Sequence, residues 1–264
     1  MSLAPSLDIR GLPAFDDNYI WLLSAAGRAA VVDPGDASPV LRHLEQSGDR
    51  LCAILLTHHH GDHAGGVADL LALGTVPVFG PAEEAIAGVS MPLRGGERIT
   101  LDELGIEFEV LAVPGHTRGH LAYYGPKVSD HGALFCGDTL FGAGCGRLFE
   151  GTPAQMYRSL ASLAVLPRLT SVFCAHEYTA SNLRFAAAVE PGSAAVKARI
   201  AEVAAKRARR ESTVPSTIGI ELETNPFLRW ASPEVRAAAT ERLGRPPVDD
   251  VETLAAIREW KNRF

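Results

Sequence analysis

The sequence predicts an α/β fold followed by a helical C-terminal segment, and two observations support this prediction. Short apolar runs typical of strands recur from residue 19 to residue 174, and few of them alternate polar with apolar residues. Runs that are apolar on both faces belong to sheets that are covered on both sides. Beyond residue 178 the spacing is helical and Ala is abundant. The layers of the first part are therefore helix, sheet, sheet, helix, or else a doubly wound sheet.

Eight runs are predicted to be strands, with turn residues between them. They are residues 19–23, 29–32, 51–56, 76–79, 108–113, 121–124, 133–136 and 171–174. The helices between them have recognisable starts. Ser38 begins a helix that ends near Gly48, and a second helix is expected over residues 62–71. Thr152 opens a third helix with a capping box, followed by Pro153 at the first helical position.

Four helices are predicted after His176, over residues 179–189, 193–211, 232–243 and 250–264. This change of composition predicts a domain over residues 1–177 and a helical domain over residues 178–264. Basic residues gather on the second of these helices, and a solvated face is expected because charge runs usually form one. They are Lys197, Arg199, Lys206, Arg207, Arg209 and Arg210.

The composition is that of an ordinary globular chain, with 264 residues of which 47% are hydrophobic and 21% are charged. The formal net charge of −6 argues against nucleic-acid or membrane partners, since both require a basic surface. The sequence shows no signal peptide and no apolar run of membrane-spanning length. A cytoplasmic location is expected.

The four cysteines form no C-x-x-C pair, and they are predicted to be reduced and buried. They are Cys52, Cys136, Cys145 and Cys174. Cys145 differs from the others because it lies in a glycine loop. It could serve as a nucleophile, but no base is adjacent in sequence, and a role in loop packing is favoured.

The stretch from Thr57 to His63 follows the apolar run 51–56 and holds four potential metal ligands. They are His58, His60, Asp62 and His63. Strand alternation would place His58 and His60 on one face and His59 on the other. Ordinary surface or core histidines are the alternative, but this ligand density after a buried strand favours a metal site.

Three further candidate ligands each follow an apolar run: His116, Asp138 and His176. Strand ends collect at one edge of a sheet, where loops build sites. The full set of five imidazoles and two carboxylates exceeds what one tetrahedral ion can use. Two ions with one bridging carboxylate are implied. Such a pair can share a water, lower its pKa and polarise a carbonyl, which predicts a hydrolase without a protein nucleophile.

Through these ligands the sequence resembles the metallo-β-lactamase superfamily, and within it the glyoxalase II (hydroxyacylglutathione hydrolase) family. Lactamases of this fold commonly carry Cys at the position of Asp138. An aspartate at this position resembles the broader group of dinuclear hydrolases. The matching stretches extend over essentially the whole chain. They are residues 15–19, 57–66, 114–117, 137–141, 144–147, 150–152, 176–179 and 225–227. The resemblance implies an αββα sandwich followed by a C-terminal helical domain that binds substrate.

The resemblance also implies how the ligands divide between two divalent ions, zinc being expected and iron or manganese possible. One ion would be bound by His58, His60, His116 and Asp138, and the other by Asp62, His63, Asp138 and His176. Asp62 and Asp138 would be catalytic. A metal-bridging hydroxide would attack the thioester of S-D-lactoylglutathione and give D-lactate and glutathione, a step of methylglyoxal detoxification. The substrate is a small molecule, and a monomer is expected.

Five substrate contacts carry over from the family. Arg258 and Lys261 match a basic pair on the glycine carboxylate of glutathione, and Tyr178 matches a hydroxyl donor. Arg147 and Phe149 stand where relatives often have Lys and Tyr. Phe149 cannot donate a hydrogen bond, a loss of about 1 kcal/mol that would alter KM but not the reaction class.

The remaining histidines are expected away from the ions. His59 and His120 would lie behind the ligands or in the core, and His43 and His131 at the surface. Other enzymes of the same fold remain alternatives, such as a persulfide dioxygenase, a lactonase or a lactamase, although the helical segment with Arg258 disfavours them. A non-catalytic metal-binding protein is a further alternative.

Overall fold

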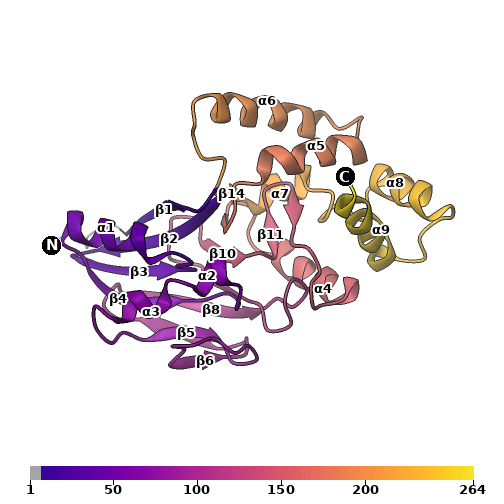
Figure 1. The fold of residues 1–264 in the computed structure, drawn as a ribbon. Helices are drawn as coiled ribbons and strands as arrows, with labels where there is room; N and C mark the ends of the chain where they lie inside the picture. The colour runs from indigo at the N-terminus through magenta and orange to yellow at the C-terminus, as the bar shows by residue number, and fades with distance from the viewer. Residues whose placement is uncertain (1–6) are drawn as a thin grey trace. The chain divides into compact units, whose positions relative to one another are not determined.

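The structure is a computed structural model that describes residues 7–264 (Figure 1). The chain divides into two compact units. The N-terminal unit comprises the residues up to 112 together with 119–137, and the C-terminal unit comprises residues 113–118 and 138–264. Among the described residues, no helix is long and apolar enough to cross a membrane.

The first sheet of the N-terminal unit has six strands in sequence order. They are β1 (Asp8–Ala14), β2 (Asn18–Ala25), β3 (Arg28–Val32), β4 (Arg50–Leu55), β5 (Val78–Pro81) and β6 (Met91–Leu93). The first three strands pair antiparallel, and β3 to β6 pair in parallel. Parallel neighbours need crossover connections. Three helices lie in these connections: α1 (Ala37–Ser47), α2 (Gly61–Ala64) and α3 (Val67–Leu71).

Helices α1 and α3 cover one face of this sheet. Ile20 and Leu22 of β2 share a buried apolar cluster with Val40 of α1 and Leu70 of α3. Side chains at alternate strand positions point to opposite faces, so Trp21 lies on the other side, where it is buried as well. Burial on both faces confirms the interpretation of the non-alternating apolar runs.

The second sheet of this unit is antiparallel, and aromatic residues fill its core. Its strands are β7 (Arg98–Leu101), β8 (Ile106–Ala112), β9 (Leu121–Gly125) and β10 (Ala133–Gly137). Phe108 packs edge to face against Phe135 and Tyr123, with ring centroids 5.9 and 6.3 Å apart. The Tyr123 hydroxyl donates to the backbone oxygen of Leu56 at 2.8 Å, which ties this sheet to the end of β4.

The C-terminal unit is mainly helical, as predicted. Its helices are α4 (Pro153–Ala164), α5 (Thr179–Val189), α6 (Ala194–Ala208), α7 (Ile218–Thr224), α8 (Pro233–Leu243) and α9 (Asp250–Asn262). Its strands are β11 (Leu140–Phe141), β12 (Gly144–Cys145), β13 (Ser171–Cys174) and β14 (Ser216–Thr217). Helix α5 packs on α6, and α9 packs on both α8 and α4 (Figure 1).

Two glycines break the helix that was predicted over residues 62–71. The structure has two short helices there, α2 and α3, with Gly65 and Gly66 between them. A Cβ on Gly66 would lie 2.5 Å from the Ala37 nitrogen and 2.6 Å from the Pro34 oxygen. Only glycine permits this close backbone approach. The prediction of helical structure was therefore correct, but it missed the interruption at Gly65 and Gly66.

The solvated basic face predicted for α6 is wrong at one position. Arg199 is only 6% exposed, and its Nη2 lies 2.6 Å from Oε1 of Glu221, a carboxylate that is fully buried. The sequence prediction also missed α7 and the strands β1, β6, β7, β11, β12 and β14. These strands are short or carry exposed polar residues, so they lack the apolar runs by which the others were recognised.

Candidate metal centre

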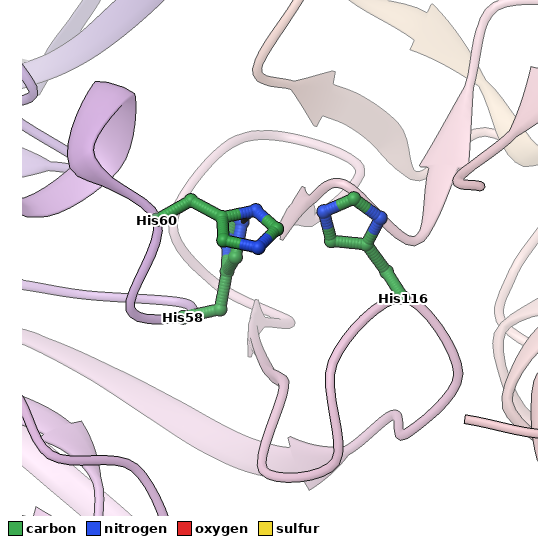
Figure 2. A group of neighbouring side chains, drawn as sticks. All are labelled: His58, His60 and His116. Atoms are coloured by element: carbon green, nitrogen blue, oxygen red, sulfur yellow. Dashed lines mark hydrogen bonds between the residues drawn. The ribbon is translucent and has the colours of Figure 1, made fainter. Parts of the chain in front are cut away.

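The first candidate ligands lie in the loop after β4 rather than in the strand itself, because β4 ends at Leu55. His58 and His60 nevertheless point toward each other, with His58 Nε2 3.0 Å from His60 Nδ1. Two nitrogens bound to one tetrahedral zinc ion at about 2.0–2.1 Å would be roughly 3.3 Å apart. The separation of these nitrogens therefore suits a shared ion. Figure 2 shows both rings leaving this loop, and His116 leaving the loop that follows β8.

Asp33, a carboxylate just after β3, orients two of the imidazoles. Its Oδ2 accepts from the Thr57 hydroxyl at 2.7 Å and lies 3.0 Å from His63 Nδ1. Because the Thr57 hydroxyl donates its hydrogen bond to Asp33, its oxygen accepts from His58 Nδ1 at 3.1 Å. Both histidines thus carry their proton on Nδ1 and keep the Nε2 lone pair for an ion.

Asp62 and His63 form the second part of the motif. Asp62 Oδ2 lies 3.5 Å from His63 Nε2, so both atoms can face one ion. The Asn18 amide, at the start of β2, donates to the same Asp62 oxygen at 3.0 Å. This contact fixes the carboxylate rotamer. The sequence reasoning noted Asn18 only as part of a family motif and assigned it no role.

His59, unlike the neighbouring ligand histidines, contacts Glu84. One Glu84 oxygen accepts from the His59 backbone nitrogen at 2.7 Å and lies 2.9 Å from the His59 ring. The other oxygen accepts from the Gly119 nitrogen at 3.0 Å. Glu84 therefore stabilises the loop that carries the ligands. The sequence alone did not indicate this role for Glu84.

In the C-terminal unit, Asp138 lies between two histidines. Its Oδ2 is 3.4 Å from His116 Nε2, and its Oδ1 is 3.3 Å from His176 Nε2. Each carboxylate oxygen thus faces a different imidazole, as expected of a carboxylate that bridges two ions. His116 Nδ1 donates to the Arg147 carbonyl at 2.8 Å, which leaves the Nε2 lone pair available.

The five predicted substrate residues line one cavity of about 370 Å³ within the C-terminal unit. They are Arg147, Phe149, Tyr178, Arg258 and Lys261. His116 and Asp138 also line this cavity, so the proposed metal ligands border it. The Tyr178 ring stacks on the His176 ring, with centroids 4.6 Å apart and planes at 6°.

The basic pair on α9 has two different environments. Arg258 is only 5% exposed, and its Nη1 donates to the Cys145 carbonyl at 2.8 Å. Lys261 lies with its Nζ 5.1 Å from the centre of the Phe185 ring. Burial, together with the charge of Arg258, lowers the pKa of Lys261 from 10.5 to about 8.

The remaining histidines differ in how far they are buried, whereas the four cysteines are all buried. His120 is buried and stacks on His58 with centroids 4.6 Å apart, as predicted, and His131 is exposed. His43, predicted at the surface, is half-buried and lies 3.3 Å from Asp49. None of the four cysteines forms a disulfide and all are buried, as predicted, and burial raises the pKa of the Cys145 thiol. A buried thiol with a raised pKa is a poor nucleophile.

Comparison with known proteins gives two family matches that together extend over most of the chain. Residues 14–176 match the metallo-beta-lactamase superfamily, and residues 177–264 match the hydroxyacylglutathione hydrolase C-terminus. The hydroxyacylglutathione hydrolase of Dechloromonas aromatica is 55% identical, over 98% of this chain and all of that protein. That of Cupriavidus taiwanensis is 54% identical, over 98% of this chain and 99% of that protein.

Solved structures agree with the sequence matches. The crystal structure of TTHA1623 in a di-iron-bound form is 28% identical, with a TM-score of 0.58 over 84% of this chain and all of that one. The predicted fold class, a metallo-β-lactamase-like αββα sandwich followed by a helical region, is thereby confirmed.

Proposed function

Because this chain belongs to the hydroxyacylglutathione hydrolases of the metallo-β-lactamase superfamily, we propose that it hydrolyses S-D-lactoylglutathione to D-lactate and glutathione. The full-length identity of 54–55% to enzymes of that name is the observation that carries this proposal. The reaction is that of methylglyoxal detoxification. The sequence-based assignment as a thioester hydrolase agrees with these relatives.

Divalent metal ions fit the three overlapping groups of His and Asp side chains found among the described residues. We propose that His58, His60, His116 and Asp138 hold one ion, and that Asp62, His63, Asp138 and His176 hold the other. Nδ1 of His58, His63 and His116 faces an oxygen acceptor in each case, which orients Nε2 for metal binding and supports their assignment as ligands. The di-iron relative supports a pair of ions, with zinc proposed here and iron or manganese as alternatives.

When bound, the ions supply Lewis-acid polarisation of the thioester carbonyl and lower the pKa of a water toward neutrality. In this proposal Asp138 and Asp62 have the catalytic role of positioning the reacting groups. The Asn18 amide orients the Asp62 carboxylate, and the two Asp138 oxygens face His116 and His176. The leaving thiol has a pKa of about 8.5 and departs as a thiolate. A strong protein acid is therefore not required.

The C-terminal unit supplies the substrate contacts in this proposal. Arg258 and Lys261 bind the glycine carboxylate of glutathione, and the Tyr178 hydroxyl donates to the peptide. Arg147 and Phe149 line the same cavity, where the Arg147 guanidinium lies 6.0 Å from the centre of the Phe149 ring. This basic cavity in a chain of net charge −6 supports an anionic small-molecule substrate.

The proposal also covers the domain boundaries, the oligomeric state and the location of the protein. Residues 1–177 would form the metal-binding domain, and residues 178–264 the substrate-binding domain. The protein would act as a monomer in the cytoplasm, without nucleic-acid or membrane partners. The acidic composition supports the expected absence of nucleic-acid and membrane partners.

Asp138→Ala tests the proposed centre. Wild-type protein should release glutathione and D-lactate from S-D-lactoylglutathione, whereas the variant should bind less metal and lose this activity while keeping its circular dichroism spectrum. Elemental analysis and a thiol-release assay measure both effects. A variant that keeps two metals and near-normal turnover would refute the bridging role. A wild-type protein without thioesterase activity would favour the non-catalytic alternative.

A further inference from the structure

The turn between β11 and β12 forms part of the wall of the substrate cavity. Phe141 and Cys145, at its two ends, both line that cavity. The Cys145 carbonyl accepts from Nη1 of Arg258 at 2.8 Å, so the turn sets the position of the buried guanidinium. A displacement of this carbonyl would move the side chain proposed to bind the glycine carboxylate.

This turn has a backbone conformation that does not form readily. Ala143, within the turn, has φ of +55°, in the left-handed region. For a residue with a Cβ this conformation costs about 1–2 kcal/mol. Surrounding contacts must therefore hold the turn in place.

Glu221 and Asn225 of the α7 region make these contacts. Oε2 of Glu221 accepts from the Ala143 backbone nitrogen at 2.7 Å and from the Asn225 amide at 2.9 Å. The same Asn225 amide lies within hydrogen-bonding distance of two turn carbonyls, Phe141 at 3.2 Å and Gly144 at 2.9 Å. The Glu221 carboxylate thus binds a backbone N–H group of the turn, and the Asn225 amide binds its carbonyl groups.

The charge of Glu221 is compensated from the other side. Its Oε1 lies 2.6 Å from Arg199 Nη2 and also accepts from the Ser216 hydroxyl. Arg199 Nη1 in turn donates to the Thr224 hydroxyl. Glu221 is fully buried, so a negative charge is stable there only because each oxygen has such partners.

We propose that Glu221 is a positioning residue for glutathione binding, an inference that rests on the proposed function. Its carboxylate, with Asn225, sets the β11–β12 turn, and the turn places Arg258 in the cavity. The salt bridge to Arg199 orients the Glu221 carboxylate for this task. Glu221 itself does not line the cavity and would not touch the substrate.

Glu221→Gln tests this role, and Glu190→Gln provides a matched control. Glu190 is a second buried carboxylate of the same unit, 1% exposed and 2.8 Å from Arg229 Nε. Among the described residues, its carboxylate accepts from Arg229 and Ser232, which both lie outside the turn. Both substitutions remove the charge of a buried carboxylate that pairs with an arginine, but only the first changes the support of the turn.

Steady-state kinetics on two substrates separates the outcomes. In Glu221→Gln we expect KM for S-D-lactoylglutathione to rise about fivefold to fiftyfold with kcat nearly unchanged, as for weakened uniform binding. Hydrolysis of S-lactoyl-N-acetylcysteamine, which lacks the glycine carboxylate, should be unaffected. Glu190→Gln should change neither substrate's kinetics. An unchanged KM in folded Glu221→Gln, or an equal rise in Glu190→Gln, would overturn the inference.

Asn225→Ser keeps the proposal testable if Glu221→Gln does not fold. This variant loses the amide that reaches Phe141 and Gly144 but leaves the Arg199–Glu221 pair intact. Calorimetry with S-methylglutathione should show an affinity at least threefold weaker than in the wild type. Equal affinity would overturn the inference. If the wild type hydrolyses no glutathione thioester, the proposed function fails first, and the two failures are thereby distinguishable.

Discussion

At the residue scale, hydrogen bonds from neighbouring groups determine which ring nitrogen of each histidine is available. Asp33 fixes His63 directly and His58 through Thr57, and the Arg147 carbonyl fixes His116. A donor on one ring nitrogen leaves a lone pair on the other, which is the form that binds metal. The same scale governs the substrate cavity, where the charges of single side chains determine affinity.

Lys261→Met should weaken glutathione binding selectively. A charge-assisted contact is worth about 1.5–3 kcal/mol, so KM for S-D-lactoylglutathione should rise roughly tenfold to a hundredfold. The glycine end of the substrate is remote from the thioester, and kcat should change little. Lys261 is a better choice than Arg258, whose buried side chain also contacts Cys145. Kinetics with S-lactoyl-N-acetylcysteamine is the control. Equal losses on both substrates would show that Lys261 supports the fold.

The lowered pKa of Lys261, about 8, predicts a pH dependence. Below pH 7 the ammonium is fully formed and can bind the carboxylate, and above pH 8 most of the charge is lost. The ratio kcat/KM, which reports on the free enzyme, should therefore fall between pH 7 and 9 toward the value of Lys261→Met. The variant itself should lack this step. A step of equal size in both proteins would assign the titration to another group.

At the element scale, short stretches that begin or interrupt helices control the local structure. The capping box at Thr152 starts α4, and α4 packs against α9, which carries the basic pair. Gly65 and Gly66 end α2 and allow the backbone to pass close to Pro34. The capping box depends only on residues close in sequence, so a single substitution can test it.

Thr152→Ala should lower the stability of the protein without changing its chemistry. The Thr152 hydroxyl accepts from the Gln155 backbone nitrogen at 3.2 Å, and removal of such a cap costs about 0.5–2 kcal/mol. In a protein of this size, the melting temperature should fall by about 1–8 °C. Thr152→Ser, which keeps the hydroxyl, should melt close to the wild type. Indistinguishable melting of the Ala variant would mean that the box contributes nothing measurable.

At the scale of the whole molecule, charge and metal content matter most. The chain carries a net charge of −6, yet the cavity of the C-terminal unit contains Arg147, Arg258 and Lys261. Seven candidate ligands come from segments that are far apart in sequence, from His58 to His176. An ion that binds such ligands in the native chain, but not in the unfolded chain, stabilises the native state.

Metal removal should therefore lower thermal stability as well as activity. At ion concentrations of 100 to 1,000 times Kd, each ion stabilises the fold by about 2.7–4.1 kcal/mol. Dialysis against a chelator, which removes both ions, should lower the melting temperature by roughly 10–30 °C. Zinc, iron or manganese added back singly should restore it, and the ion that also restores thioesterase activity identifies the working metal. A melting temperature insensitive to chelation and to added ions would contradict the proposed centre.

The sequence by itself determined the α/β fold class, the helical C-terminal region and the candidate ligands. These follow from local patterns: apolar runs for β3 and β4, helical spacing after residue 178, and a high density of histidines at residues 58–63. Each pattern is read within a few neighbouring residues. The family resemblance then added the division of ligands and the substrate contacts.

Only the tertiary structure decided which partners hold these groups. Asp33 is 24 residues from Thr57, Glu84 is 25 from His59, and Glu221 is 78 from Ala143. Nothing in the local sequence marks Arg199 as buried, because a charge run is recognised only by its composition. Burial of Arg199 became favourable when folding brought Glu221 within 2.6 Å and removed both from water. Contacts of this kind depend on the folded chain as a whole.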